Sequence, residues 1–376
     1  MARPSSAGDR RGVDGLADDL AKQVTTTQGD CPPYTRVLTA MRELVEGPNA
    51  DAEIVAHLDR CWQGRLFTAG YERPLLMCAA LRHEAILEGS RHPLFGAIAA
   101  VNPDPAVATR ERVAASFSSD RIGLWITLTA RRVQTNEVTR GVVWRWPAWL
   151  AGCDAARRPL ALVDIGASAG LNLISERLAI TWTDAAGRAL PVASRLDCRT
   201  RIGFDTSPID VRFEDDVTWL RACLWPGDHQ RLARFDDAVA AMRTAYADPG
   251  GAPELHALQA GIVPSRLDAL AKGLDVGVFV LAYQSFVRGY LEPARQEAYV
   301  RGMRAWLASL TPGRAAWVEC EMGDGNEPQF PAQMLAHAHV GGGEVRAFPI
   351  ARCSYHPRVV KVDEAAAEQF RRSLHR

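Results

Sequence analysis

The stretch LVDIGASAGLNLI, residues 162–174, decides how the rest of the chain is interpreted. An apolar run ends at Asp164, and three small residues, Gly166, Ser168 and Gly170, follow at alternate positions. Glycine allows backbone angles and close approaches that a side chain would prevent. We therefore predict a buried strand that turns sharply into a helix. In an open parallel sheet such a strand end borders a ligand, and the first N–H groups of the helix face it.

Short apolar runs alternate with helical segments from this stretch to the C-terminus. The expected strands cover residues 160–166, 200–205, 276–283, 315–322 and 343–351. The expected helices cover residues 169–178, 217–225, 230–247, 264–273 and 293–310. This alternation predicts an α/β fold, with a mainly parallel sheet and helices on both faces.

The N-terminal part has a different pattern. Helical apolar periodicity recurs, with no strands between, in residues 35–47, 51–62, 72–89 and 121–150. Asp51 is a candidate N-cap, and glycines end two of the segments. We predict a disordered tail at residues 1–28, a helical domain or cap at 29–155, and a sheet domain at 156–376.

Composition limits the class of partner. Lys+Arg and Asp+Glu both number 44, so the formal net charge is zero, which argues against a broad surface for nucleic acid. No segment approaches the roughly 20 apolar residues that cross a bilayer, and the N-terminus lacks the apolar region of a secretory signal. The eight cysteines show no C-x-x-C spacing, so we expect neither a zinc site nor a disulfide framework. We predict a cytoplasmic protein that binds a small molecule, with no nucleic-acid or membrane partner.

The spacing of small residues selects among ligands for the turn. The dinucleotide fingerprint G-x-G-x-x-G fails at Ser168 and Leu171, and the Gly-Lys-Ser/Thr ending of a phosphate loop is absent. The acid-x-Gly-x-small-x-Gly pattern resembles class I S-adenosylmethionine (SAM)-dependent methyltransferases, although Ser168 stands where glycine is commoner. The resemblance implies SAM as cofactor. The cofactor-binding residues it implies in this stretch are Asp164, Gly166, Ala167, Ser168, Gly170 and Asn172.

An acid at the end of the second strand normally holds the ribose hydroxyls of such a cofactor. Asp184 lies 20 residues after Asp164, but its Asp-Ala-Ala-Gly context is typical of a hairpin turn. Asp205 ends an apolar run and precedes Thr-Ser-Pro, as in methyltransferases. We interpret residues 178–192 as an inserted hairpin and favour Asp205.

A second unusual stretch, VQTNEVTR, covers residues 133–140. It concentrates polar side chains between apolar segments: Gln134, Thr135, Asn136, Glu137 and Arg140. On a helix, Arg132, Asn136 and Arg140 would share one face. A solvated face or a helix-end salt bridge would also explain the stretch, but its apolar flanks indicate burial, where such groups need partners.

Together VQTNEVTR, DIGASAGLNL and the stretch from RIGFDTSPIDV to WLRACLWP resemble an uncharacterised bacterial family, known as a domain of unknown function. The resemblance covers residue 50 to the C-terminus. It implies a Rossmann-like class I methyltransferase fold behind a helical N-terminal region, and it implies no particular reaction.

Two strand ends supply further candidates. In class I methyltransferases the fourth strand ends beside the substrate, and here that end presents Tyr283 and Gln284. Histidine tends to stand at the position of Gln284 in the family, which argues against histidine base chemistry there. On the fifth strand Glu319 and Glu321 point to one face. Glu321, which matches the family's acid, would orient a substrate or act as a base if burial raised its pKa.

Three histidines complete the candidate set. His356 matches a family histidine position and is a candidate for the pocket. His337 and His339 are spaced i, i+2 with no third ligand nearby, so we expect no metal site.

The function predicted from these features is methyl transfer from SAM to an oxygen or nitrogen of a small polar molecule. We expect the substrate contacts to come from Gln134, Asn136, Glu137, Arg140, Tyr283, Gln284, Glu321 and His356, with Arg140 holding a carboxylate. One alternative is a non-catalytic SAM or nucleoside binder, which would not need the polar stretch. Another is an enzyme of a different class on the same scaffold, such as an oxidoreductase, which the failed dinucleotide pattern disfavours.

Overall fold

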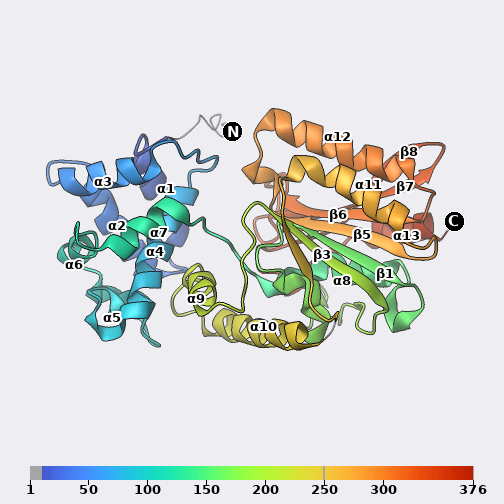
Figure 1. Cartoon of the computed structure of the whole chain (residues 1–376), viewed down its shortest axis with the longest axis horizontal. Coiled ribbons are helices and arrows are strands. Elements are labelled where there is room, and N and C mark those ends of the chain that lie inside the picture. Colours follow the sequence, from blue (N-terminus) through green and yellow to red (C-terminus); the bar gives the residue numbers. More distant parts are fainter. Residues whose placement is uncertain (1–10, 249, 376) are drawn as a thin grey trace. The chain divides into compact units, whose positions relative to one another are not determined.

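A computed structural model describes residues 11–248 and 250–375 (Figure 1). The chain divides into two compact units. The helical unit comprises the described residues up to Thr135 together with Arg212–Ala233. The sheet unit comprises Asn136–Val211 and the described residues from Arg234 onward. The first boundary therefore differs from the expected position at residue 155, and residues 212–233 belong to the helical unit.

The helical unit consists of amphipathic helices that bury their apolar faces against one another. Asp51 caps α3 as predicted, because its carboxylate accepts the N–H groups of Glu53 and Ile54. The α-helices are α1 (Leu16–Thr27), α2 (Pro32–Val45), α3 (Ala52–Trp62), α4 (Glu72–Glu88), α5 (Phe95–Ile98), α6 (Arg110–Ala115), α7 (Ile122–Ala130) and α9 (Glu214–Ala222). Short 3-10 helices are η1 (Gly89–Arg91) and η2 (Pro105–Val107), and α10 (His229–Ala247) begins in this unit and continues into the sheet unit.

The expectation of a disordered tail at residues 1–28 is wrong for its second half. Residues 1–10 lie outside the described part, but α1 starts at Leu16 and buries Leu16 and Leu20. On the same helix Asp19 forms a buried ion pair with Arg73 of α4 at 2.6 Å. A paired buried charge and two buried leucines explain why this segment is ordered.

The sheet unit contains one nine-stranded sheet. Its strand order is β2-β9-β8-β7-β6-β5-β1-β3-β4. In this order, β4, β3, β1, β5 and β6 are each parallel to the next. β7 is antiparallel to both β6 and β8, and β9 is antiparallel to β8 but parallel to β2. The bounds are β1 (Leu160–Ile165), β2 (Thr183–Asp184), β3 (Cys198–Asp205), β4 (Glu254–Ala257), β5 (Phe279–Ser285), β6 (Ala315–Met322), β7 (Ala332–Gly341), β8 (Glu344–Cys353) and β9 (Val359–Val362). The predicted α/β class with a largely parallel sheet is thus confirmed.

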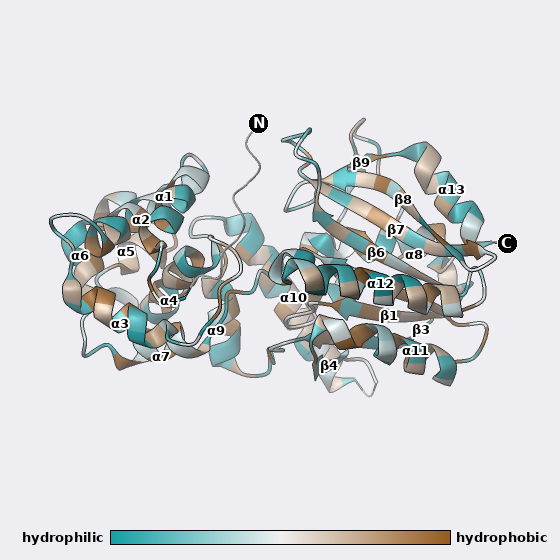
Figure 2. Ribbon diagram, turned by 90° about the horizontal axis from the view of Figure 1, so that it is seen from above, coloured by the Kyte–Doolittle hydropathy of each residue, from teal (hydrophilic) through white to brown (hydrophobic). Residues whose placement is uncertain are grey.

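Helices cover both faces of this sheet (Figure 1). On one face, α11 (Val263–Gly273) and α12 (Pro293–Ser309) pack on β1, β5 and β6 through a core that includes Val163, Ala282 and Trp317. On the other face lie α8 (Val142–Leu150) and α13 (Glu364–Leu374). The strands are largely apolar, and α12 turns hydrophilic residues outward (Figure 2). Short 3-10 helices in this unit are η3 (Val138–Gly141), η4 (Asp154–Ala156), η5 (Leu171–Arg177), η6 (Ala260–Ile262) and η7 (Arg288–Tyr290).

The helix expected at residues 169–178 is present as a 3-10 helix and not as a regular α-helix. A kinked 3-10 helix, η5, occupies this position. Three side chains from other elements donate to its carbonyl groups: Trp144 to Asn172, Arg201 to Leu173 and Arg145 to Ser175. These donors satisfy the carbonyls in place of regular α-helical hydrogen bonds. The turn is therefore not followed by an α-helix whose N-terminus could bind a ligand.

Candidate functional site

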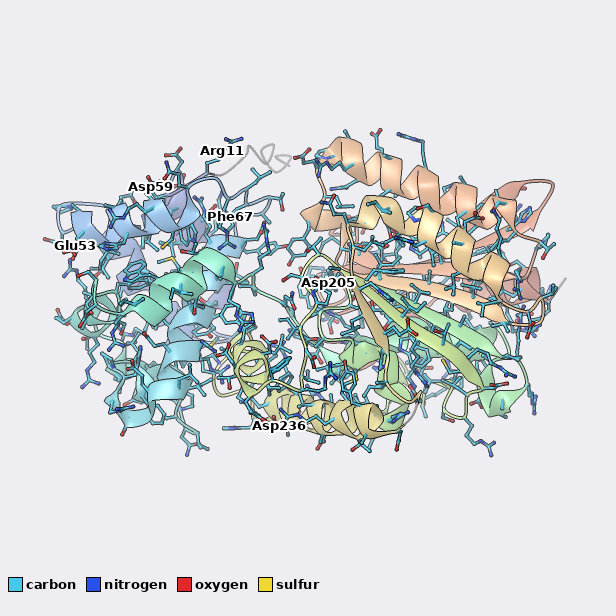
Figure 3. All side chains as sticks on the ribbon, in the orientation of Figure 1. Arg11, Glu53, Asp59, Phe67, Asp205 and Asp236 are labelled. Atoms are coloured by element: carbon cyan, nitrogen blue, oxygen red, sulfur yellow. The ribbon has the colours of Figure 1, made fainter. Side chains whose placement is uncertain are left out.

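The carboxyl ends of several strands meet at one edge of the sheet. β1, β3, β5 and β6 are parallel, and β8 returns to the same direction because β7 is antiparallel to both of its neighbours. Asp205, labelled in Figure 3, ends β3 at this edge. The chain passes from β1 to β3 on one side and reaches β5 on the other, so the strand order reverses beside β1. In open α/β sheets ligands bind at such a point.

The turn after β1 contains three residues with positive φ. Gly166 has a φ of 82°, Gly170 of 70° and Ser168 of 52°. A Cβ at Gly166 would lie 2.6 Å from Cγ2 of Val287, and one at Gly170 would lie 2.9 Å from Cδ2 of Leu255. Packing within the chain therefore requires both glycines, whether or not a ligand also approaches them. Ser168, a non-glycine residue in the left-handed region, marks a strained backbone of the kind found at functional sites.

Asp205 holds this turn. Its Oδ2 accepts the N–H of Ser168 at 2.8 Å, and its Oδ1 accepts the N–H of Ser207 at 2.8 Å. Asp184 lies on β2, at the opposite end of the strand order, where it accepts hydrogen bonds from Ala186 and Arg188. The predicted hairpin is confirmed, and its strand joins the sheet beside β9. Of the two competing acids, only Asp205 adjoins the turn.

Residues 136–140 lie directly against the turn. Nδ2 of Asn136 donates to Oγ of Ser168 at 2.9 Å. Nδ2 of Asn172 donates to the carbonyl of Glu137 at 3.3 Å. Asn136, Glu137 and Arg140 are all at most 9% exposed, which agrees with the burial inferred from their apolar flanks.

Arg132, Asn136 and Arg140 were expected to share one face of a helix. This is wrong, because the segment is not a regular helix. Residues 131–137 have no helical structure, and η3 begins at Val138. The Glu137 side chain caps η3 by accepting the N–H of Thr139, so the chain enters this short helix from an extended conformation. Gln134 belongs to the helical unit, whereas the other candidates belong to the sheet unit.

Asp164 and Tyr283 form a buried pair on the α8 face of the sheet. The Tyr283 hydroxyl donates to Oδ2 of Asp164 at 2.7 Å. Burial raises the pKa of Asp164 to about 7, the charge of Asp205 acts in the same direction, and the Tyr283 hydrogen bond and Arg140 oppose the rise. Burial also raises the pKa of Tyr283, so the phenol stays the donor. Asp164 is therefore an acid at the turn that is close to half-protonated at neutral pH.

Gln284 faces the opposite side of the sheet, since successive side chains of a strand alternate. It is fully buried, and its amide contacts only protein groups in the described chain. Nε2 donates to Glu321 at 2.7 Å, and Oε1 accepts from Tyr299 and from Trp317. This differs from the substrate-facing position expected for Gln284, and its observed contacts position Glu321.

Glu321 anchors the segment after β5. Its Oε1 accepts the N–H groups of Val287 and Arg288 at 3.0 and 3.1 Å, besides the Gln284 amide. Burial raises the pKa of Glu321. The condition set for a base, a pKa raised by burial, is therefore met, while Oε1 is engaged in holding Val287 over Gly166.

Glu319 and the two β7 histidines form structural contacts. Glu319 pairs with Arg288 and with His337, each at 3.0 Å, and the His337 ring stacks on Trp317. His339 contacts the carbonyl of Leu310. No cluster of three or more potential metal ligands occurs in residues 11–248 and 250–375.

The loop after β8 brings His356 to the polar stretch. Nδ1 of His356 lies 3.0 Å from Oε2 of Glu137. Nε of Arg140 donates to the carbonyl of Tyr355 at 3.2 Å, and the Arg140 guanidinium lies 4.5 Å from the ring centre of Phe286. Thus the structure brings Asn136, Glu137, Arg140 and His356 together with the turn.

Sequence reasoning missed Phe286 and Val287. Phe286 has a φ of 57°, and this strained residue directs Val287 onto Gly166. No motif marks either residue. The only signal in the sequence is that both residues directly follow the strand expected beside the turn.

The hollows described in the structure lie in the helical unit. They measure about 190 and 570 Å³ and share the aliphatic residues Val13, Val45 and Val55. Their linings consist of residues other than the candidates, so they add nothing to the site at the sheet edge.

The fold and the site define an α/β protein with a buried polar cluster at the carboxyl edge of a largely parallel sheet. The chain belongs to the bacterial family described as "Uncharacterized protein conserved in bacteria" (DUF2332), which matches residues 17–362. This confirms the family predicted from the motifs and extends the match toward the N-terminus. A search of curated proteins finds no match. No helix in the described part of the chain is long and apolar enough to span a membrane.

Proposed function

We propose that this protein is a SAM-dependent methyltransferase that acts on an oxygen or nitrogen of a small polar molecule. The observation that carries the proposal is the contact between Asn136 and Ser168. It joins a buried polar segment to the glycine turn at the point where ligands bind in open α/β sheets.

The topology supports the proposal. Taken in chain order, the five parallel strands β1, β3, β4, β5 and β6 are arranged 3-2-1-4-5. This is the order of a Rossmann-like fold over the same strands. The remaining strands, β7, β8, β9 and β2, follow β6 in this order and lie outside the parallel part.

Asp205, at the end of β3, and Asn172, just after the turn, could both hydrogen-bond to an adenosyl cofactor. Asp205 ends β3 and is partly exposed, and each carboxylate oxygen can accept a hydroxyl in addition to its backbone N–H. Oδ1 of Asn172 is buried with no hydrogen-bond partner among the described residues, and so remains an acceptor for a donor group. At Gly166, Val287 occupies the adjacent space, so closer approach there requires the segment after β5 to move.

SAM, when bound, would supply an electrophilic methyl group. The chain's part is then to orient the acceptor and exclude water, because positioning provides much of the rate of such a transfer. Asp205 would hold the ribose hydroxyls. Arg140, Glu137 and His356 would face the acceptor. The burial of Arg140 and Glu137 and the contact of Glu137 with His356 argue against a protein that only binds SAM.

Isothermal titration of the full-length protein with SAM, S-adenosylhomocysteine and NAD tests the proposal. We expect saturable binding of the first two and none of NAD. Binding of NAD alone, or of none of the three, would contradict it.

Replacing Asp205 by Asn should weaken SAM binding about 10- to 100-fold. A charged hydrogen bond contributes about 1.5–3 kcal/mol, and each 1.4 kcal/mol is about tenfold in affinity. Titration with SAM measures the loss. The matched control is Asp184→Asn, which changes another hydrogen-bonded aspartate at the far end of the strand order and should leave SAM affinity unchanged. Equal losses in both variants would show a general effect on stability, so unfolding of each should be measured in parallel.

A further inference from the structure

Glu137 and His356 combine a buried acid with an exposed imidazole. The Glu137 side chain is 1% exposed and that of His356 is 44% exposed, with 3.0 Å between Oε2 and Nδ1. The two residues are far apart in sequence and meet only because β8 returns to the carboxyl edge.

The Glu137 carboxylate is held in one orientation. Its Oε1 accepts both the N–H and the hydroxyl of Thr139, at 3.1 and 2.7 Å. The carbonyl of Thr139 in turn accepts from Nε1 of Trp182 at 2.9 Å, and the carbonyl of Glu137 accepts from Asn172. With Oε1 engaged in this way, Oε2 is directed at His356.

We infer the state of the imidazole from this contact, which is an ion-pair contact and not a hydrogen bond. A carboxylate oxygen carries only lone pairs, and a nitrogen lone pair 3.0 Å away would be repelled by them. In the neutral ring we therefore expect the proton on Nδ1, which leaves the lone pair on Nε2. Arg140 holds the preceding peptide through the carbonyl of Tyr355, which keeps the histidine backbone in place.

We propose that Nε2 of His356 is the general base of the site and that Glu137 is its positioning residue. This rests on the proposed function and narrows it to an acceptor that starts protonated, namely a hydroxyl or an ammonium group. Nε2 would take the acceptor's proton, and the electron pair that the proton leaves behind would form the new bond to the methyl carbon. The electron pair of the carbon–sulfur bond would depart with the thioether, and the imidazolium would return its proton to water.

The tautomer of His356 tests the dyad without any substrate. In full-length protein labelled with ¹⁵N-histidine, long-range ¹H–¹⁵N spectra should show His356 protonated on Nδ1, with the signal assigned by its loss in His356→Gln. In Glu137→Gln, the Thr139 N–H still requires an acceptor, so the amide oxygen takes the Oε1 position. The amide NH₂ then faces Nδ1, and the tautomer should invert to Nε2–H. A structural role for Glu137 alone would not cause this inversion.

His256 provides the matched control. It also pairs with a glutamate, Glu254 at 3.5 Å, but both side chains are more than half exposed. Exposed pairs of this kind are weak, so Glu254→Gln should not change the His256 tautomer.

Activity supplies the second readout. Methyl transfer from tritiated SAM to a deproteinised bacterial small-molecule extract should fall about 10²- to 10⁴-fold in His356→Ala, the usual contribution of a general base. Added imidazole should restore part of it, since the missing ring lies on an exposed surface. SAM affinity should stay within a few-fold of the parent in His356→Ala and Glu137→Gln.

The outcomes separate the two proposals. An Nε2–H tautomer in the parent protein, or no inversion in Glu137→Gln, would overturn the dyad even if SAM binds. Failure of SAM to bind the parent would overturn the proposed function, and the tautomer would still decide whether Glu137 orients His356.

Discussion

Gly166→Ala should destabilise the protein by about 2–5 kcal/mol and, if the turn binds the cofactor as proposed, also weaken SAM binding. An alanine at a φ of 82° costs about 1–2 kcal/mol, and overpacking against Cγ2 of Val287, 2.6 Å from the new Cβ, costs about 1–3 kcal/mol. A separate loss of affinity follows from the proposed cofactor site, because the new methyl group would lie between the turn and a cofactor that took the place of Val287. A larger replacement such as Gly166→Val would fail to distinguish these effects, since the clash with Val287 alone could unfold the site.

Combining Gly166→Ala with Val287→Ala separates packing from binding. The second change removes the clashing methyl groups, so part of the lost stability should return. SAM affinity should not return if the turn contacts the cofactor. Val287→Ala alone should bind SAM at least as well as the parent, because it uncovers Gly166. Denaturant unfolding and titration calorimetry measure the two quantities.

Gly302→Ala serves as the control for this cycle. A Cβ there would lie 2.9 Å from Pro264, so this change also overpacks the sheet unit, but between α12 and α11. It should reduce stability with no effect on SAM affinity. Recovery of SAM affinity in the Gly166/Val287 double variant would show that the glycine serves packing alone.

The stability of Asp164→Asn relative to the parent should rise with pH. The folded-state pKa of Asp164 is raised to about 7, mainly by burial, above an unfolded value near 3.9. Between these values the folded state binds the extra proton, so the parent loses stability as pH rises through this range. The difference approaches about 4 kcal/mol above pH 7 at most, and it is absent below pH 4. Asparagine removes this dependence and can still accept the Tyr283 hydroxyl.

Thermal or urea unfolding of both proteins from pH 4 to 9 measures the difference. Only its change with pH is diagnostic, because the unpaired NH₂ of asparagine adds a constant cost. Asp324→Asn is the control of opposite sign. The hydrogen bond from Arg352 lowers the pKa of Asp324 to about 2, so its contribution to parent stability is present at neutral pH and is lost as pH falls toward 2. A pH-independent difference for Asp164→Asn would contradict the raised pKa.

Local patterns in the sequence predicted the parts of the fold that local interactions determine. All five expected strands are present as β1, β3, β5, β6 and β8. β1, β5 and β6 are buried along almost their whole length and are therefore nearly continuous apolar runs. β3 and β8 are only partly buried, and shorter apolar stretches marked them. Strands β4 and β9 have four residues each and β2 has two, too few for periodicity to be visible. β7 has ten residues but was not predicted, because its two histidines interrupt the apolar pattern.

The candidate site was predictable where burial could be inferred from flanking residues, and not where contacts were long-range. The apolar flanks of residues 136–140 correctly indicated burial. The helix expected there was wrong because Glu137 caps η3, so that the residues before it are extended. Tyr283 and Gln284 were grouped because they are adjacent, but strand alternation sends them to opposite faces. The Glu137–His356 contact depends on the path of β7 and β8, which no local pattern specifies.

The division of the helical unit into two chain segments has a consequence for synthesis on the ribosome. α4 packs against α9, and Arg131 pairs with Asp215 and Asp216, so helices made early depend on residues 212–233. Residues 136–211, a stretch of roughly 75, are translated in between, which takes about 4–15 s at 5–20 residues per second. During that interval the nascent helices lack their last partner, and α4 exposes apolar side chains that α9 later covers. The N-terminal segment therefore does not complete its fold first, as sequential domains usually do, and this interval is when the emerging chain would most need a chaperone.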